Sequence, residues 1–358
     1  MVRFVIEKII SGILTLFGVA TVVFFLFNVL PGDPAQMVLD QNATEQQLLK
    51  VKKKYGFDLP IGTQYLLYLN DLSPLSFHSK EPDAFSFYKK DQFGGYRILS
   101  FSKVDVIFKV PYLRTSYQRQ GKNVGTIITE TLPNTMVLAA ASIGIAIIFG
   151  FFFGIVSGVY KGTWIDASIQ MISTLGMSIP SFFSAILFSW FFGYLLFEFT
   201  NLNMTGSLFE LDDYGDQVDL QFKNLILPAF VLGIRPIAVI VQLVRSGLIE
   251  VLTQDYIRTA KAKGLSQQAI IYRHALKNSL NPVITAVSGF FASMLAGAVF
   301  VEYIFGWRGI GKEIVIALNT LDIPVVMGSV LIIATLFILI NIFVDLLYVV
   351  IDPQAKPF

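Results

Sequence analysis

Long stretches without a charged residue constrain this chain more than any other feature of its sequence. Asp, Glu, Lys and Arg are all absent from five windows: 9–32, 131–160, 167–197, 278–301 and 323–344. A sixth apolar run, 225–244, is interrupted only by Arg235. A helix of about 20 residues crosses the ~30 Å hydrocarbon core of a bilayer. We therefore predict an all-α membrane protein with six transmembrane helices, since membrane-barrel strands are shorter and alternate in polarity.

Composition supports a multi-pass membrane protein and excludes several function classes. Of the 358 residues, 54% are hydrophobic and 15% are charged, and the mean hydropathy is +0.64. The net charge of +2 gives no indication of nucleic-acid binding. The absence of cysteine excludes disulfides, thiolate metal sites and cysteine nucleophiles. The two histidines, His78 and His274, lie far apart in sequence, so a His-rich metal site is not expected, although carboxylates alone could hold an ion.

The distribution of basic residues predicts the orientation. Six spans place both termini on one side, together with the 161–166 turn and the 245–277 loop, and these segments hold ten Lys and Arg. The connections 198–224 and 302–322 hold three. The positive-inside rule then places both termini and the 245–277 loop in the cytoplasm. The first window is expected to be an uncleaved span, because it is too long for a signal peptide and Leu30–Pro34 is not a small-residue cleavage site.

The chain divides into residues 1–30 with the first span, an external segment at 31–133 and a core at 134–358. Long loops translocate largely regardless of charge, so the thirteen Lys and Arg of the external segment do not contradict its position. Residues 44–56 predict a short amphipathic helix that Thr44 caps and Gly56 ends. Tyr96–Val110 alternates as a strand does. The segment forms either a small folded cap or a docking surface for an external partner.

Small residues and prolines give the spans individual features. Gly150, Gly154 and Gly158 recur on one helical face, and so does a stripe in the fifth span formed by Ala286, Gly289, Ser293 and Gly297. Such stripes let helix backbones approach closely in lipid. Packing within the chain is the favoured interpretation, and a subunit contact or pathway lining is the alternative. Pro180 is expected to kink or break the third span.

Arg235 lies about ten residues from either end of the fourth span. A mid-membrane arginine is costly and should face protein or water. Two hypotheses have equal weight. In the first, Arg235 has a structural role and either pairs with backbone carbonyls or stabilises a break at Pro236. In the second, it forms a cation in a transport cavity that attracts an anionic substrate group such as a peptide carboxylate. Asp345 is near the end of the sixth span and can reach the interface, so a structural role is expected for it.

The basic stretch Asp255–Ser266, DYIRTAKAKGLS, predicts a helix, a sharp turn and a second helix. Gly264 can adopt the left-handed conformation that ends a helix, and Ser266 can cap the next one, which runs through Lys277. Alanine and glycine leave a flat surface, and the basic side chains supply charge. Such an element fits a groove on another protein or rests on anionic lipid headgroups, and the residues alone favour neither.

Several ordered motifs resemble the permeases of ABC importers, specifically the first permease of the dipeptide, oligopeptide and nickel branch. They are Leu30–Pro34 (LPGDP), Leu132–Ala139, Ser178–Phe183, Leu225–Ala229, Val244–Gly264, DYIRTAKAKGLSQQAIIYRHALKNSLNPVI, and the C-terminal runs VEYIFGWRGIGKEIVIAL, DIPVVMGSVL and VDLLYVVIDP. The general signature begins Glu-Ala-Ala, where this chain has Arg258-Thr259-Ala260 followed by Gly264. The resemblance covers most of the chain except about 75–110, which looks like an insertion.

This resemblance implies a type I ABC importer permease fold in the bacterial inner membrane. It identifies 245–281 as the coupling loop, with Arg258, Thr259, Ala260, Lys261, Lys263, Gly264 and Leu265 at the contact with a cytoplasmic ATPase. It also implies a homologous second permease in a heterodimer, an external substrate-binding protein and surrounding lipid. No Walker A pattern occurs, so ATP and Mg²⁺ are expected on the partner ATPase, with no catalysis and no cofactor in this chain.

Peptides are the first expectation for the solute, and nickel chelates or other small solutes come next. Two other function classes stay open on the residues alone. A secondary transporter or channel would need ion-coupling carboxylates within the spans, and only Asp345 comes close. An intramembrane enzyme would need paired acids, a metal motif or a serine–lysine pair at membrane depth, and the sequence shows none of them.

Overall fold

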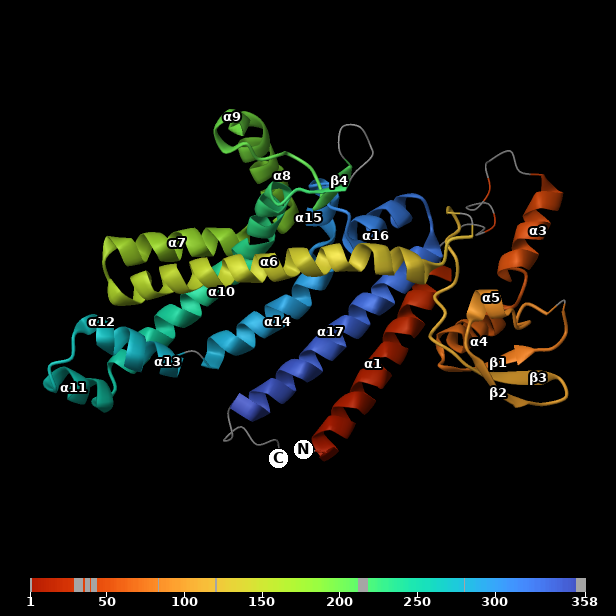
Figure 1. Cartoon of the computed structure of the whole chain (residues 1–358), viewed down its shortest axis with the longest axis horizontal. Helices are drawn as coiled ribbons and strands as arrows, with labels where there is room; N and C mark the ends of the chain where they lie inside the picture. The colour runs from red at the N-terminus through yellow and green to blue at the C-terminus, as the bar shows by residue number, and fades with distance from the viewer. Residues whose placement is uncertain are drawn as a thin grey trace. The chain divides into compact units, whose positions relative to one another are not determined.

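The computed structural model describes residues 2–28, 35, 39, 44–82, 84–119, 121–211, 218–279 and 281–351. These residues form two compact units (Figure 1). The first comprises residues 1–130 and 313–335, and the second comprises residues 131–312 and 336–358. The motif Leu30–Pro34, the acidic residues 212, 213 and 216, and the tail 352–358 lie outside the described residues.

Four described helices are long and apolar enough to cross a membrane. They are α1 (Val2–Asn28), α6 (Val124–Val159), α10 (Lys223–Leu252) and α17 (Ile323–Ile351). A bent pair adds a fifth span if its two halves count as one: α7 (Trp164–Ser178) and α8 (Ser181–Trp190), continued by the π-helix η1 (Phe191–Leu195). The two halves meet at 108° across Ile179 and Pro180, which confirms the predicted break.

The window 278–301 is less regular than the sequence predicts. It holds α14 (Asn281–Gly297), whose 17 residues are short for a span, followed by α15 (Val299–Ile304). Length and composition therefore give four or five spans among the described residues and not six. The expected break at Pro236 is wrong, because α10 continues unbroken through Pro228 and Pro236.

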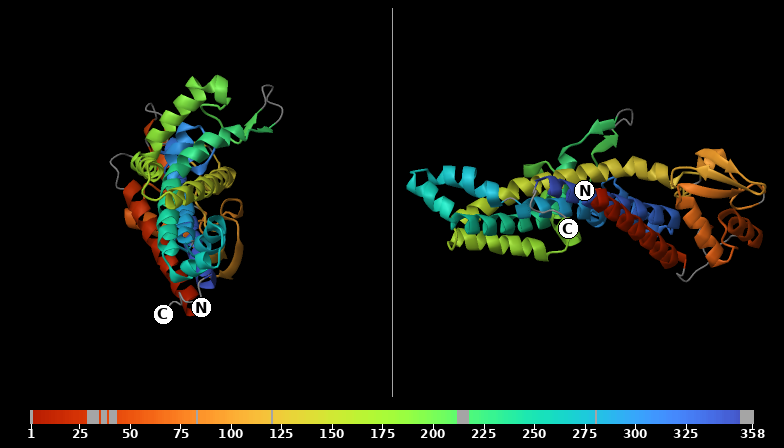
Figure 2. Two further views of the ribbon diagram at one scale, coloured as in Figure 1. Left: turned by 90° about the vertical axis from the view of Figure 1, so that its left-hand side faces the viewer. Right: turned by 90° about the horizontal axis from the view of Figure 1, so that it is seen from below.

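The first unit contains most of the external segment as a small α/β fold. It comprises α3 (Glu45–Tyr55), α4 (Ile61–Leu72), β1 (Leu75–Ser79), α5 (Lys90–Phe93), β2 (Tyr96–Ser100) and β3 (Val104–Phe108). The strands form an antiparallel sheet in the order β1-β3-β2, coloured orange in the right-hand view of Figure 2. With β4 (Phe209–Leu211) and β5 (Val218–Leu220) of the second unit, these strands correct the all-α prediction.

Local sequence accounts for the elements of this segment. Thr44 and Gln47 form the reciprocal capping box of α3, and Gly56 ends the helix at φ +73°, as predicted. Tyr96–Val110 is a hairpin and not one strand, because the chain turns at 101–103 and β3 pairs back on β2. Buried aromatic packing joins α1 to α4 and α17, since Phe24 and Tyr68 lie in one cluster with Met327 and Leu331.

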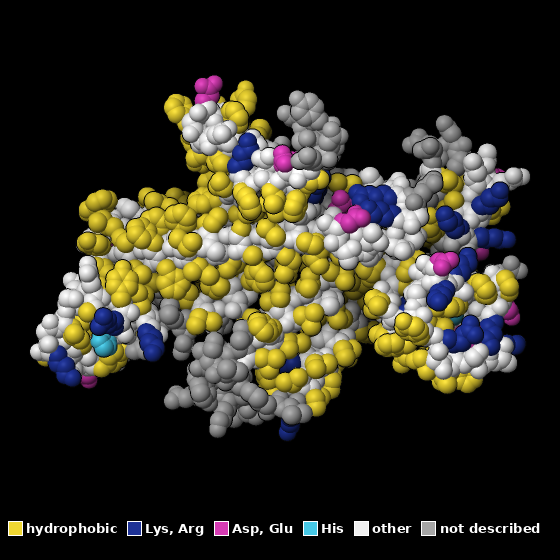
Figure 3. Space-filling model, viewed as in Figure 1, with side chains coloured by type: hydrophobic (Ala, Val, Ile, Leu, Met, Phe, Trp, Pro, Cys, Tyr) yellow, Lys and Arg dark blue, Asp and Glu magenta, His cyan; other side chains and the backbone are white. Residues whose placement is uncertain are grey.

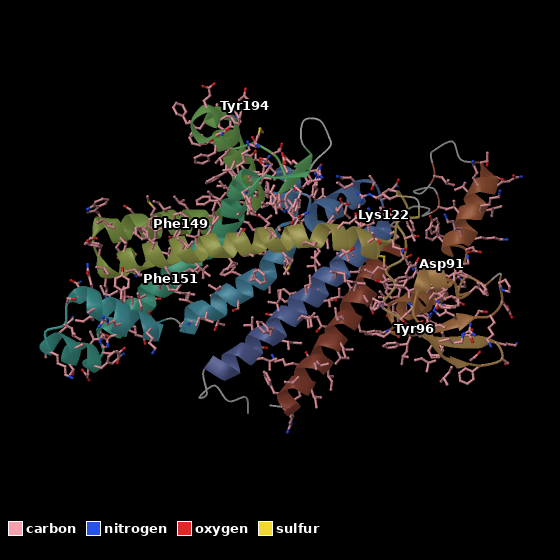
Figure 4. The ribbon with its side chains drawn as sticks, viewed as in Figure 1. Asp91, Tyr96, Lys122, Phe149, Phe151 and Tyr194 are labelled. Atoms are coloured by element: carbon pink, nitrogen blue, oxygen red, sulfur yellow. The ribbon has the colours of Figure 1, made fainter. Side chains whose placement is uncertain are left out.

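The second unit contains most of α6 and the helices from α7 to α15, and its largest apolar cluster lies between α6, α8, α10 and α14. Leu138, Leu232, Leu295, Phe305 and Trp307 lie in this cluster and are almost fully buried. Helix α6 lies directly against α10, because a Cβ on Gly150, Gly154 or Gly158 would come within 3 Å of a side chain of α10. Phe149 of α6, labelled in Figure 4, contacts Phe230 of α10 edge to face. The first small-residue stripe therefore serves packing within the chain, as the favoured interpretation had it.

Candidate functional site

The basic element after α10 is a helix whose two faces differ. Helix α11 (Asp255–Ala262) buries Ile257 and Ala260 against Leu248 of α10 and against Ile270 and Ile271. The opposite face carries Arg258, Thr259 and Lys261, all exposed. Figure 3 shows Lys and Arg side chains gathered over this part of the chain, whereas hydrophobic side chains cover α6 and α7. Helix α11 is thus held on one face by an apolar cluster and presents cations on the other.

Gly264 ends this helix in the conformation that the sequence predicts. Its φ is +76°, and a Cβ on it would meet open space. The Leu265 amide donates to the Ala260 carbonyl, the bond that closes a left-handed helix end. Lys263, Gly264 and Leu265 are exposed and continue the cationic face of α11. Ala260 differs from the other predicted coupling residues, because its side chain lies within the apolar cluster and is 7% exposed.

The second half of the element connects α11 to the apolar helix α14. Ser266 accepts a hydrogen bond from the Ala269 amide and caps α12 (Gln267–Ala269), as predicted. The helix continues as a π-helix, η2 (Ile270–Ala275), and then as α13 (Leu276–Ser279). Gly247 of α10 packs against Ser279 with no room for a Cβ. This contact fixes the last turns of α10 to α13. The two ends of the segment that carries α11 are therefore held together.

An ion pair with a buried carboxylate holds the C-terminal part of α10, the part that leads into α11. Both oxygens of the Asp166 carboxylate, at the start of α7, accept hydrogen bonds from the Arg245 guanidinium at 2.7 Å. Ser157 of α6 and the Gly162 amide also donate to Asp166. The four groups come from α6, the turn after it, α7 and α10. This network fixes α10 a few residues before α11 begins, and sequence patterns give no sign of it.

Arg235 lines a cavity of about 230 Å³ formed by α7, α8, α10 and α14. Ser181 and Ser184 from α8 and Ser293 and Gly297 from α14 also face this cavity. The Arg235 side chain is exposed and forms no ion pair or hydrogen bond with any residue that the structure describes. The pairing with backbone carbonyls that the structural hypothesis included is therefore absent from the described part of the chain.

The second small-residue stripe differs from the first. Gly289, Ser293 and Gly297 of α14 are exposed, and a Cβ on either glycine would meet nothing within 4 Å. This face of α14 therefore has no packing partner among the described residues of its own chain. Since Ser293 and Gly297 also line the Arg235 cavity, the stripe and the cation belong to one candidate pathway surface.

A glycine-rich turn after α15 surrounds a buried carboxylate. Glu302 is fully buried, and its Oε2 accepts hydrogen bonds from the Gly311 and Lys312 amides at the start of α16 (Ile310–Asn319). A Cβ on Gly309 would collide with this carboxylate. Its Oε1 has no hydrogen-bond partner among the described residues. Burial raises the pKa of Glu302 to about 7 and outweighs the hydrogen bonds that lower it.

The same turn is fastened to α6. The Trp307 indole donates to the Asn134 backbone carbonyl at 3.0 Å, and the Asn134 side-chain Nδ2 donates to the Arg308 carbonyl at 2.8 Å. Thr135 accepts from the Ile310 amide. The run VEYIFGWRGIGKE is therefore a structural junction between α15, α16 and α6. Within the described ranges, no group of three His, Cys, Asp or Glu is placed to hold a metal ion.

Comparisons with known proteins give a consistent result. Residues 150–357 match the family model described as binding-protein-dependent transport system inner membrane component, and residues 1–81 match the N-terminal model of the same systems. The dipeptide transport system permease protein DppB of Alkalihalophilus pseudofirmus is 34% identical over 99% of this chain and 100% of its own length. The oligopeptide transport system permease protein AppB of Bacillus subtilis is 30% identical over 99% and 100%.

A solved structure of a methionine ABC transporter, MetNI in inward-facing conformations, also resembles part of this chain. The similarity covers 64% of this chain and 97% of that one, with a TM-score of 0.48 and 14% identity.

Proposed function

Because the chain belongs to the family of binding-protein-dependent transport system inner membrane components, we propose that it forms half of the pore of an ATP-driven importer of di- and oligopeptides. The relatives named as dipeptide and oligopeptide permeases, similar over 99% of the chain, support the peptide as solute. The other half would come from a homologous second permease. An external binding protein would deliver the peptide, and ATP hydrolysis would belong to cytoplasmic partners.

The proposed topology has six spans with both termini in the cytoplasm. The sixth would be α14 extended by the turns on either side, since 17 helical residues at 1.5 Å each fall short of the ~30 Å core. The excess of Lys and Arg on one side supports the orientation. In this arrangement α11 projects into the cytoplasm, and the three-stranded sheet of the external segment lies outside.

The exposed face of α11 is the observation that carries the coupling role. We infer that Arg258, Thr259, Lys261, Lys263, Gly264 and Leu265 contact the ATPase, and that Ala260 and Ile257 fasten the helix to its own chain. A helix held by an apolar cluster and a fixed base transmits displacement as a rigid body. Movement of the ATPases would then bias the pore between inward and outward access, with peptide and ATP shifting the two populations.

The cavity beside Arg235 is the proposed peptide path through this subunit. Its serine hydroxyls and one unpaired guanidinium suit a polar, partly anionic solute such as a peptide carboxylate. An arginine without a partner is tolerated at membrane depth only where it faces water or another protein chain. A path at the interface with the second permease meets that requirement.

Gly264→Asp tests the coupling role. The change adds a negative charge to the cationic face at a position with open space, so the chain should insert normally. Co-purification with the ATPase should fall sharply, and uptake of labelled di- and tripeptides by a deletion strain should drop below a tenth. Gly264→Ala adds the same strain at positive φ, worth about 1 kcal/mol, without the charge, and should retain most uptake. Unchanged ATPase binding by Gly264→Asp would reject the proposal.

A further inference from the structure

The external segment contains a cavity that the transport argument does not use. Its volume is about 580 Å³, and it lies wholly within the first unit. The end of α3, the segment after β1, helix α5 and the stretch from Tyr112 to Asn123 form its walls. Sites for small ligands usually measure about 300–1,000 Å³ and combine apolar walls with a few fixed polar groups. This cavity has both.

Arg114 is the fixed polar group. Its Nε donates to Asp71 Oδ2 at 2.9 Å, and its guanidinium lies over the Tyr68 ring at 5.7 Å. Asp71 is itself held, because its backbone carbonyl accepts hydrogen bonds from Lys109 and from the Tyr112 amide. Of the three guanidinium nitrogens of Arg114, only Nε has a hydrogen-bond partner among the described residues. Its terminal nitrogens are left to bind a ligand carboxylate through two parallel hydrogen bonds.

The rim of the cavity is basic. Lys53, Lys54 and Lys89 line it, and so does the acid Asp91 of α5, which is labelled in Figure 4. The other lining acid, Asp71, is already paired with Arg114. Lys53 and Lys89 are exposed and form no ion pair with a residue that the structure describes. The surplus positive charge favours an anionic ligand.

Aromatic rings form the remaining walls. Tyr55 and Tyr117 meet edge to face at 4.7 Å, and Phe93 and Tyr112 meet at 4.9 Å. Phe87 also lines the cavity. Such walls accept an aliphatic or aromatic side chain next to a carboxylate bound by Arg114. The combination fits the last residue of a peptide, whose carboxylate and side chain are both attached to one Cα.

We propose that this cavity is a binding site for the C-terminal end of a free short peptide, separate from the pathway beside Arg235. The carboxylate and the apolar side chain follow from the geometry, whereas the peptide as ligand rests on the proposed function. The site holds peptide at the outer surface of the permease without any contribution from the ATPase. Binding to this chain alone therefore tests it independently of transport.

The experiment is calorimetric titration of the full-length chain in lipid nanodiscs, without partner subunits or ATP. The probes are Ala-Phe, its C-terminal amide Ala-Phe-NH₂, and free Phe. Ala-Phe should bind, and the amide should bind at least tenfold more weakly because it lacks the carboxylate. Free Phe should also bind more weakly than the dipeptide, because it lacks the preceding residue. Equal affinity for Ala-Phe and its amide, equal affinity for Ala-Phe and Phe, or no binding of Ala-Phe would overturn the proposal.

Variants locate the binding. Arg114→Gln should abolish binding but also leaves Asp71 buried without its partner. The decisive variant is therefore Lys53→Gln/Lys89→Gln at the exposed rim, which should weaken binding about fivefold. Lys50→Gln/Lys90→Gln removes the same charge from neighbouring positions that do not line the cavity, and should leave the affinity unchanged. A control pair that weakens binding as much as the rim pair would show a nonspecific charge effect and contradict the site.

One further variant separates this site from the pathway. Arg235→Gln should leave Ala-Phe binding unchanged, since Arg235 lies in a different unit of the chain. Loss of binding in Arg235→Gln would place the peptide in the pathway and refute the outer site. In the unaltered chain, Ala-Phe binding combined with no peptide uptake by the assembled transporter would count against the transport proposal alone.

Discussion

Arg245 donates from Nε and Nη2 to the two oxygens of Asp166, at 2.7 Å each, across 79 residues of sequence. Asp166 is 4% exposed and the Arg245 side chain 27%, so the carboxylate is withdrawn from solvent while the guanidinium keeps partial access to it. Removing the cation would leave a buried carboxylate with only Ser157 and the Gly162 amide as donors. The stability of α10, and with it the position of α11, therefore depends on this pair.

Arg245→Ala should destabilise the chain by about 3 kcal/mol, because an uncompensated buried charge is more costly than a missing pair. Thermal unfolding in detergent measures the change. Asp166→Asn/Arg245→Gln should lose less than Arg245→Ala, since it removes both charges. Arg258→Gln is the matched control, because the Arg258–Asp255 pair is exposed and should matter little. Equal losses of stability in Arg245→Ala and Arg258→Gln would show that the Asp166–Arg245 pair stabilises the chain no more than an exposed ion pair does.

Gly154→Leu should disrupt the packing of α6 on α10. Its Cβ would lie 2.7 Å from the Val244 Cβ, so the helices must separate. Overpacking of this kind costs about 1–3 kcal/mol per buried site. Gly144→Leu on the same helix is the control, because a Cβ there meets nothing within 4 Å. The melting temperature in detergent should fall for Gly154→Leu and not for Gly144→Leu. Gly154→Ala should lower it less, and adding Val244→Ala to Gly154→Ala should recover part of that loss, because it removes the Cγ1 methyl group that the new Cβ meets. No difference between the two leucine variants would argue against close packing.

Glu302 should make stability depend on pH. Its pKa rises from 4.5 to about 7 on folding, which corresponds to roughly 3 kcal/mol. A raised carboxyl pKa means that the folded state binds the proton more tightly. This contribution is therefore complete below pH 4.5 and is lost as the pH rises through 7.

Melting temperatures between pH 4.5 and 8 test this linkage. Glu302→Gln keeps an acceptor for the Gly311 amide but cannot titrate, so its melting temperature should decline less across this range than that of the unaltered chain. Glu198→Gln, at an exposed position, should behave as the unaltered chain does. Identical pH profiles for Glu302→Gln and the unaltered chain would contradict the raised pKa.

Arg235→Gln should leave folding intact, because the side chain has no partner among the described residues, and should raise the KM for peptide uptake by about tenfold. That factor is the effect of losing one charge-assisted hydrogen bond, about 1.5 kcal/mol or more. Lys223→Gln, at the first residue of α10, removes a charge away from the cavity and serves as control. Unaltered uptake by Arg235→Gln at a normal expression level would leave Arg235 without a role in the pathway.

Local patterns in the sequence predicted the features that local physics determines. The uncharged windows gave the long helices, Pro180 gave the break, and the sign of φ at Gly56 and Gly264 followed from helix ends that only glycine adopts easily. The hairpin within Tyr96–Val110 was missed because both arms alternate in the same phase and the turn at 101–103 carries no Gly, Pro, Asn or Asp.

Long-range partners could not be predicted from one sequence. Nothing in the spacing of Asp166 and Arg245 indicates that they form an ion pair. The burial of Glu302 was equally unpredictable, because it depends on Gly309 and Gly311 packing against the carboxylate in the folded chain. Ala260 looks like part of a flat exposed surface in the sequence, yet it packs inward, because the phase of α11 places it beside Ile257. The outer cavity likewise depends on residues from Lys53 to Asn123 that only the fold brings together.

The bend between α7 and α8 has a consequence for the membrane around this chain. Pro180 supplies no side-chain cap, so the first amides of α8 lack partners within their own helix, inside an apolar window. Hydrocarbon does not tolerate bare backbone amides, and such a break persists only against water or protein. One flank of this subunit is therefore unfit for contact with acyl chains. In a bilayer, water or protein and not acyl chains must therefore lie beside Pro180.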